Sequence, residues 1–183
     1  MKIKLSIFFI GLSMFAFGQV ALGKSEVSNP SVSLEFGTQY RGLILPYVTS
    51  LSSVSDVVPG TIVMDGSDRV VKYARPNGDW RALTFNTQHT FGGVTLDTTG
   101  KVDRSLQSSK TDKTDASVII GANTSGQPSG ILVLSDNNKA MILPKMDSPH
   151  LKIINPAPGM MAYDTKMNQL AVFNGTVWTF WKD

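Results

Sequence analysis

Short runs of apolar and β-branched residues follow one another along most of the chain, and each run is bounded by Gly, Pro, Asn, Asp or Ser. Beyond the N-terminal segment, no stretch repeats apolar residues at positions i, i+3, i+4 and i+7 over the length of a helix. This pattern is typical of an all-β protein. The expected strands are residues 31–36, 42–47, 61–64, 69–73, 80–85, 131–134, 140–145, 160–163, 169–173 and 177–181.

One pattern occurs twice along the chain. Residues 34–46 (LEFGTQYRGLILP) and residues 132–144 (LVLSDNNKAMILP) align without a gap. A repeated motif predicts a repeated structural unit, and such units pack or bind more often than they catalyse. We therefore expect two related β-hairpin modules, unit one at residues 31–85 and unit two at residues 131–183. The shared downstream residues are Pro59-Gly60, Asp65, Asn77-Gly78 and Trp80 in unit one, and Pro158-Gly159, Asp164, Asn174-Gly175 and Trp178 in unit two.

The two Asn-Gly pairs predict the turns of these hairpins. Asn-Gly is the dipeptide that most readily takes positive φ at both central residues of a type I′ turn, which matches the twist of the flanking strands. We therefore expect type I′ turns at Asn77-Gly78 and at Asn174-Gly175.

A polar segment, residues 86–130, joins the two units and is rich in Thr, Ser, Gly, Asp and Lys. Its centre, residues 105–117 (SLQSSKTDKTDAS), has almost no apolar side chain to bury. Such a stretch cannot offset the entropy of its own ordering, so it is expected to be a partly disordered linker. Residues 94–96 and 117–121 are candidates for isolated strands within it.

The N-terminal segment has the layout of a secretory signal peptide. Lys2 and Lys4 precede a nearly unbroken apolar run at residues 5–17, and Ala16 and Gly18 supply the small residues of a cleavage site. Residues 1–18 are therefore expected to direct export, and residues 19–30 to form a flexible N-terminus. No later run approaches the ~20 apolar residues of a membrane-spanning helix, so no integral membrane segment is expected after cleavage.

Composition excludes several classes of protein. The chain has 17 Lys and Arg against 14 Asp and Glu, and loss of Lys2 and Lys4 with the signal peptide leaves it nearly neutral. A mixed surface of this kind has no long-range field that would attract nucleic acid. Cys is absent, which excludes disulfides, thiolate metal sites and a cysteine nucleophile.

Residue patterns typical of catalysis are missing as well. The two histidines, His89 and His150, stand in polar loops without a second ligand at metal-binding spacing, and no nucleophile elbow or phosphate-binding glycine loop occurs in the mature chain. We therefore expect no enzyme activity, no metal and no cofactor. A pair of dispersed carboxylates, as in a glycosidase, is the one catalytic arrangement that the pattern leaves open.

Unit two resembles a known module. Residues 142–144 (ILP), 158–165 (PGMMAYDT) and 170–178 (LAVFNGTVW) are similar to a recurring β-module of phage tail-fibre-like proteins and of secreted and surface proteins of Gram-negative bacteria. Unit one departs from it, with Met64 in place of the Tyr and Gly66 in place of the Thr. The whole chain also resembles small secreted proteins of these bacteria. The resemblance implies a surface or envelope setting and trimeric, fibre-like assembly, and it supplies no catalytic residues.

Four aromatic residues are the candidate binding residues: Trp80, Tyr163, Trp178 and Trp181. Because side chains alternate along a strand, Trp178 and Trp181 should lie on opposite faces. An exposed Trp could stack on a sugar ring or anchor a protein contact, whereas a buried one would belong to a small core or a subunit interface.

These patterns together predict an exported, non-catalytic protein with a structural or adhesive role. It would lie in the extracellular space, on the cell surface or in the periplasm of a Gram-negative bacterium. It would act by self-association, with a homotrimer favoured, and by recognition of a surface glycan or protein. The alternative is a soluble carbohydrate-binding module that uses an exposed Trp.

Overall fold

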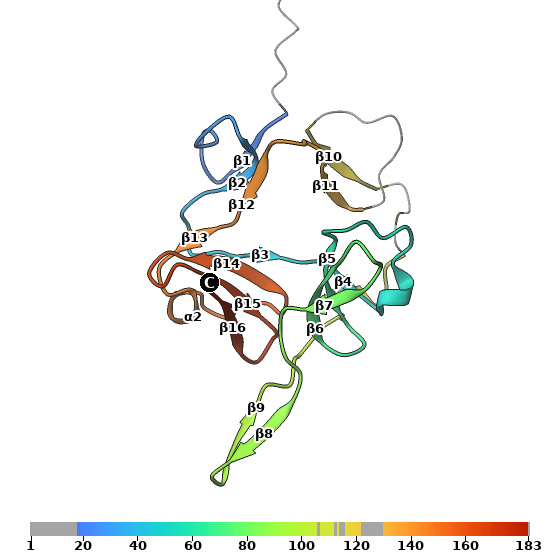
Figure 1. Cartoon of the computed structure of the whole chain (residues 1–183), viewed down its shortest axis with the longest axis vertical. Helices are drawn as coiled ribbons and strands as arrows, with labels where there is room; N and C mark the ends of the chain where they lie inside the picture. The colour runs from blue at the N-terminus through green and yellow to red at the C-terminus, as the bar shows by residue number, and fades with distance from the viewer. Residues whose placement is uncertain (1–17, 106, 112, 114–115, 122–129, 183) are drawn as a thin grey trace, which may run out of the picture.

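The computed structural model describes residues 18–105, 107–111, 113, 116–121 and 130–182 (Figure 1). The predicted signal peptide therefore lies outside the described residues, apart from Gly18, and so do several residues of the polar segment. In the described part, strands predominate and helix is limited to short turns, which confirms the all-β prediction.

Unit one folds into a four-stranded sheet of order β4-β5-β6-β7, which lies on the right in Figure 1. β4 is parallel to β5, whereas β5, β6 and β7 are antiparallel neighbours. The strands are β4 (Tyr47–Val48), β5 (Ile62–Asp65), β6 (Val70–Ala74) and β7 (Trp80–Ala82).

Unit two repeats this arrangement in the order β13-β14-β15-β16, with the same strand directions. The repeated sequence is therefore a repeated structural unit. One strand from unit one, β3, pairs antiparallel with β14 and extends this second sheet. The strands are β3 (Leu43–Ile44), β13 (Lys145–Met146), β14 (Met160–Asp164), β15 (Gln169–Phe173) and β16 (Trp178–Trp181).

A third sheet contains a strand that the sequence did not indicate. β1 (Val20–Leu22), β2 (Val32–Phe36) and β12 (Ala140–Ile142) are parallel, in the order β1-β2-β12. β1 lies in the segment that was expected to be flexible. The Lys24 Nζ atom lies 2.8 Å from Glu35 Oε1, and the Ser28 N–H donates to Glu35 Oε2 at 2.6 Å. These hydrogen bonds, Lys24 first, lower the pKa of Glu35 to about 2 and tie the segment to β2.

The connecting segment holds paired rather than isolated strands. Residues 94–96, expected as a lone strand, belong to an antiparallel hairpin that projects from the rest of the molecule in Figure 1. The second candidate pairs in parallel with the first strand of unit two. The strands are β8 (Gln88–Phe91), β9 (Val94–Asp97), β10 (Val118–Ile120) and β11 (Leu132–Leu134); the helical turns are η1 (Leu51–Ser53) and α2 (Pro149–Lys152), and neither turn was predicted.

The hydrophobic core is built where the two units meet. One apolar cluster takes buried side chains from both units, so the units pack against each other within one chain. Its members are the cross-strand pair Met64 and Val71 of unit one, the cross-strand pair Met161 and Val172 of unit two, and Leu45. A second cluster lies within unit two and consists of Met146, Ile153, Met160, Ala162 and Phe173.

The turn type predicted for the Asn-Gly pairs is wrong. Only the glycines have positive φ, 81° at Gly78 and 98° at Gly175, whereas neither Asn does. The Asn174 Oδ1 atom accepts the N–H groups of Thr176 and Val177, both at 2.9 Å, so the side chain closes the turn in place of a left-handed backbone.

Candidate functional site

Residues 42–48, which we call the first connector, join the two units. Leu43 and Ile44 of β3 pair antiparallel with Met161 and Met160 of β14, so this half of the connector belongs to the sheet of unit two. The following strand, β4, pairs in parallel with β5 of unit one. A single short segment thus completes the edges of two sheets.

The first connector also covers the bend of unit two at Gly159. A Cβ atom at Gly159 would lie 3.2 Å from the Met64 Cβ atom and 3.6 Å from the Leu45 Cβ atom. The Leu45 N–H donates to the Gly159 carbonyl at 3.2 Å, and the Tyr47 hydroxyl donates to the Pro158 carbonyl at 2.7 Å. Unit two therefore needs residues of unit one to cover its Pro-Gly bend.

Asn174 holds a second contact between the repeat units and the connecting segment. Its side chain is fully buried, and its Nδ2 atom donates to the carbonyls of Phe85 at 2.8 Å and Thr98 at 2.7 Å. The Lys101 N–H in turn donates to the Asn174 carbonyl at 2.9 Å. The turn of unit two is consequently enclosed by residues 85–101.

The two shared aspartates have a structural role. Asp65 and Asp164 are buried, and the Asp164 Oδ1 atom accepts the backbone N–H groups of Ser148, Lys166 and Met167 at 3.0 to 3.3 Å. Burial alone would raise the pKa of Asp164, but these hydrogen bonds lower it overall. In unit one, hydrogen bonds from Ser67 and Lys72 likewise outweigh burial and lower the pKa of Asp65. Both carboxylates are charged turn anchors.

The four predicted aromatic residues do not form one site. Tyr163, Leu170 and Trp181 lie opposite one another on adjacent strands, so Tyr163 and Trp181 share a face of the unit-two sheet. Trp178 pairs with Phe173 at a ring-centroid distance of 5.2 Å on the other face, as the strand alternation predicted. Trp80 belongs to the sheet of unit one.

Trp181 is the most exposed of the four, but its indole nitrogen is engaged. Its side chain is 40% exposed, and its Nε1–H group donates to the Leu83 carbonyl of unit one at 2.8 Å. Trp80, Tyr163 and Trp178 are half-buried. Trp181 therefore joins the two units as well as facing outward.

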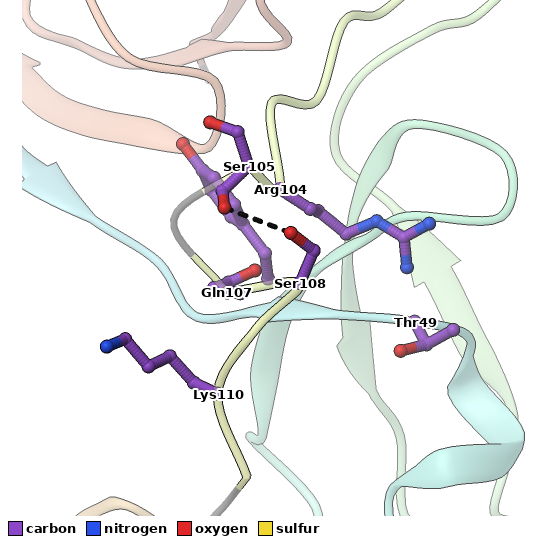
Figure 2. Close-up of a pocket in the computed structure, with 7 residues that line it drawn as sticks. Thr49, Arg104, Ser105, Gln107, Ser108 and Lys110 are labelled. Carbon is purple, nitrogen blue, oxygen red and sulfur yellow. Dashed lines mark hydrogen bonds between the residues drawn. The ribbon is translucent and has the colours of Figure 1, made fainter.

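Two surface cavities lie elsewhere on the molecule, and none of the four aromatic residues lines them. The larger, of about 470 Å³, is polar and is bordered by the basic side chains Arg104 and Lys110 (Figure 2). Figure 2 also shows the Ser108 hydroxyl, which donates to the Ser105 carbonyl at 3.0 Å. The second cavity, of about 250 Å³, is lined by the ends of β1 and β2, by residues that follow β2 up to Gly42, and by Pro144.

Neither a metal centre nor a membrane-spanning helix occurs in the part of the chain that the structure describes. Within that part, no group of three or more His, Asp or Glu side chains is placed to hold a metal ion. Nor does it contain a helix long and apolar enough to cross a membrane. His150, which was expected in a loop, lies in α2 and packs edge-on against Phe180 at a ring-centroid distance of 5.4 Å.

Known families give a match for the C-terminal part of the chain. Residues 119–182 match the family model of the phage tail like trimerisation region. This part of the chain is therefore similar to a phage tail like trimerisation region. It runs from the end of β10 to β16 and thus includes unit two, the aromatic face and residues 140–146. No curated protein and no solved structure shows a significant match to the chain.

Sequence reasoning found the repeat but missed what connects its copies. The first connector, Asn174 and the bend at Gly159 make the contacts between units, and none of them was predicted as a functional residue. Their signal was the shared Leu-Pro, Pro-Gly and Asn-Gly positions, which were interpreted only as strand ends and turns.

Proposed function

We propose that the protein is an exported, tail-fibre-like structural protein that forms a homotrimer through unit two. In this proposal it has no catalytic role and serves as an adhesive component at the cell surface or beyond it. The match of residues 119–182 to a trimerisation region carries the proposal. The burial of the shared aspartates as turn anchors supports a scaffolding role for both units.

The first test is the mass of the protein after export. We would produce the full chain in a Gram-negative host, determine the mature N-terminus by intact mass, and measure absolute mass by light scattering over a dilution series. We expect a chain that begins at Gln19 and a particle of three chains. A monomer at every concentration would contradict trimerisation, and an uncleaved or cytoplasmic chain would contradict export.

Adhesion needs a separate test, because a trimer can be purely structural. We would apply the trimer to a glycan array and to intact bacterial cells, beside a Trp181→Ala variant. If the trimer binds cells or glycans and the variant does not, recognition would involve the face of the unit-two sheet that carries Tyr163 and Trp181. Trimers that bind no surface would limit the function to structure.

A further inference from the structure

Unit one has a sheet edge like the one that β3 covers in unit two, and it is open. The Met64 N–H donates to the Pro46 carbonyl at 2.9 Å, so the polar backbone groups of Met64 face the β4 side of β5. Because backbone groups alternate along a strand, those of Ile62 face the same side. β5 pairs with β4 at Met64 and Asp65 and, within the described residues, has no strand opposite Ile62 on that edge.

The bend beside this edge is uncovered too. A Cβ atom at Gly60 would have no neighbour within 4 Å, whereas the equivalent Gly159 is enclosed by unit one. Val58, just before the bend, has 51% of its side chain exposed. Unit one therefore presents an apolar half-edge of the kind that a short added strand would complete.

The matching strand exists elsewhere in the chain. Residues 140–146, the second connector, correspond to the first connector in sequence, and their second half, β13, pairs with β14 in the same way that β4 pairs with β5. Their first half, β12, is the outer strand of the β1-β2-β12 sheet. The Ala140 N–H donates to the Ser31 carbonyl, on the β2 side of β12. The register of the pairing shifts between Ala140 and Met141, but the extra residue lies in β2, so β12 keeps its alternation and the polar backbone groups of Met141 face the open side.

We propose that the second connector of one copy adds as an antiparallel strand to the β5 edge of a second copy. By analogy with β3 on β14, Met141 lies opposite Ile62, and Ile142 lies opposite Thr61. This contact joins two different surfaces, so it repeats from copy to copy and closes into a ring when the rotation allows. The inference rests on the proposed trimer, in which three such contacts would link three chains.

Side-chain sizes are matched in both pairings. In the chain, a Cβ atom at Gly42, just before β3, would lie 2.3 Å from the Met160 Cγ atom and 2.9 Å from the Met161 carbonyl oxygen, so glycine allows the close approach of this segment to β14. The second connector has Ala140 at that position, and the side chain it would meet is the shorter Thr61 rather than methionine. The shorter Thr61 relieves the side-chain contact, and the backbone carbonyl contact requires the added strand to lie slightly farther from β5 than residues 42–44 lie from β14.

Other contacts of the first connector also have counterparts. Leu143 is half-buried against the first apolar cluster of its own chain, and its exposed part would cover Gly60 as Leu45 covers Gly159; both glycines have positive φ, 89° and 72°. The exposed Lys145 stands where Tyr47 donates to the Pro158 carbonyl, and its ammonium group can donate to the equivalent carbonyl of Pro59. The half-buried Tyr163 replaces Met64 beside the covered bend.

Engineered disulfides test this pairing in the full chain, which has no Cys of its own. Ile142 and Thr61 are the pair without mutual hydrogen bonds, with Cα atoms at about 4.5 Å, close enough for a disulfide. Under mild oxidation we expect the Thr61→Cys, Ile142→Cys double variant to yield covalent dimers and trimers on a non-reducing gel. A mixture of the two single variants should give covalent dimers that contain one chain of each.

Two control variants define the outcomes. Ile44→Cys with Met160→Cys should link within one chain, and Ile44→Cys with Thr61→Cys should not link. If light scattering shows a trimer and the first control links, but Thr61→Cys and Ile142→Cys do not, this pairing is wrong while the trimer stands. A link between them inside one chain would also overturn it. A monomer by light scattering would refute both the pairing and the proposed function.

Discussion

The two repeat units share one sheet order but differ in what covers them. In unit two, the bend at Gly159 is enclosed by the first connector, and the turn at Gly175 lies against Lys101, so that a Cβ atom there would be 2.5 Å from the Lys101 carbonyl. In unit one, the equivalent glycines, Gly60 and Gly78, have no neighbour within 4 Å of an added Cβ. The same Pro-Gly and Asn-Gly motifs are therefore covered by other residues in unit two and exposed in unit one.

The largest difference between the units should appear at the paired asparagines. Asn174→Ala removes four side-chain hydrogen bonds and leaves buried backbone groups without partners, so we expect a loss of about 3 kcal/mol in the free energy of unfolding. The exposed Asn77→Ala should cost less than about 0.5 kcal/mol. Urea unfolding of both variants measures the contrast, and equal losses would mean that residues 85–101 do not stabilise unit two.

The paired glycines give a smaller contrast that depends on assembly. Both Gly159→Ala and Gly60→Ala place a side chain at positive φ, which costs about 1 kcal/mol each. Gly159→Ala adds crowding against Met64, so it should cost about 1 kcal/mol more in the dilute, dissociated chain. In the assembled trimer, the difference between the unfolding free energies lost by the two variants should become smaller, because Leu143 of another copy then covers Gly60. Urea unfolding of both variants at two protein concentrations measures this difference. A difference that does not change with concentration would argue against a covered Gly60.

The stability of the β1-β2-β12 sheet should depend on pH. The pKa of Glu35 is lowered to about 2, against an ordinary value of 4.5, so its stabilising effect is complete above the ordinary value and is lost as the pH falls toward 2. Glu35→Gln should therefore weaken hydrogen-exchange protection of β1 at neutral pH and matter progressively less below pH ~4.5. An effect of the variant that stays constant down to pH ~2 would contradict the Lys24 and Ser28 contacts.

The smallest contrast lies in the loops between the second and third strands of each sheet. Arg69 and Asn168 occupy equivalent positions with positive φ, 61° and 52°. Asparagine tolerates this conformation better than arginine, so Arg69→Asn should stabilise by about 0.5 kcal/mol and Asn168→Arg should destabilise by a similar amount. Thermal unfolding of the two exchanges checks the sign, and shifts in the same direction would contradict equivalence of the loops.

Strands were predictable from the sequence because their apolar runs and turn residues are local signals. Residues 160–163 and 169–173 were predicted within one residue of β14 and β15. β1 was missed because its order depends on Glu35, which binds the polar segment between the two strands. The short α2 turn follows Ser148, whose backbone N–H is held by Asp164 sixteen residues away, and no local pattern reports such a contact.

The site was less predictable than the fold because its contacts cross between repeats. The motif at residues 43–46 indicates a strand that ends at a proline, but not that its first half pairs with the other unit. An Asn followed by Gly indicates a turn at Asn174. The buried hydrogen bonds that its side chain donates to Phe85 and Thr98 depend on where the connecting segment lies, which no local pattern shows. The strand alternation that separates Trp178 from Trp181 is local, and that part of the aromatic prediction was correct.

The pairing of β2 with β12 also sets an order of events during folding. It joins Val32 to Ala140, whereas the hairpin of β5 and β6 joins Ile62 to Tyr73. Contacts between distant residues form late because a long loop must close first. The hairpins of each unit should thus be protected before β12 exists, as pulse-labelled hydrogen exchange during refolding would detect. A nascent chain therefore completes its hairpins before it has a finished docking strand, which limits premature association between copies.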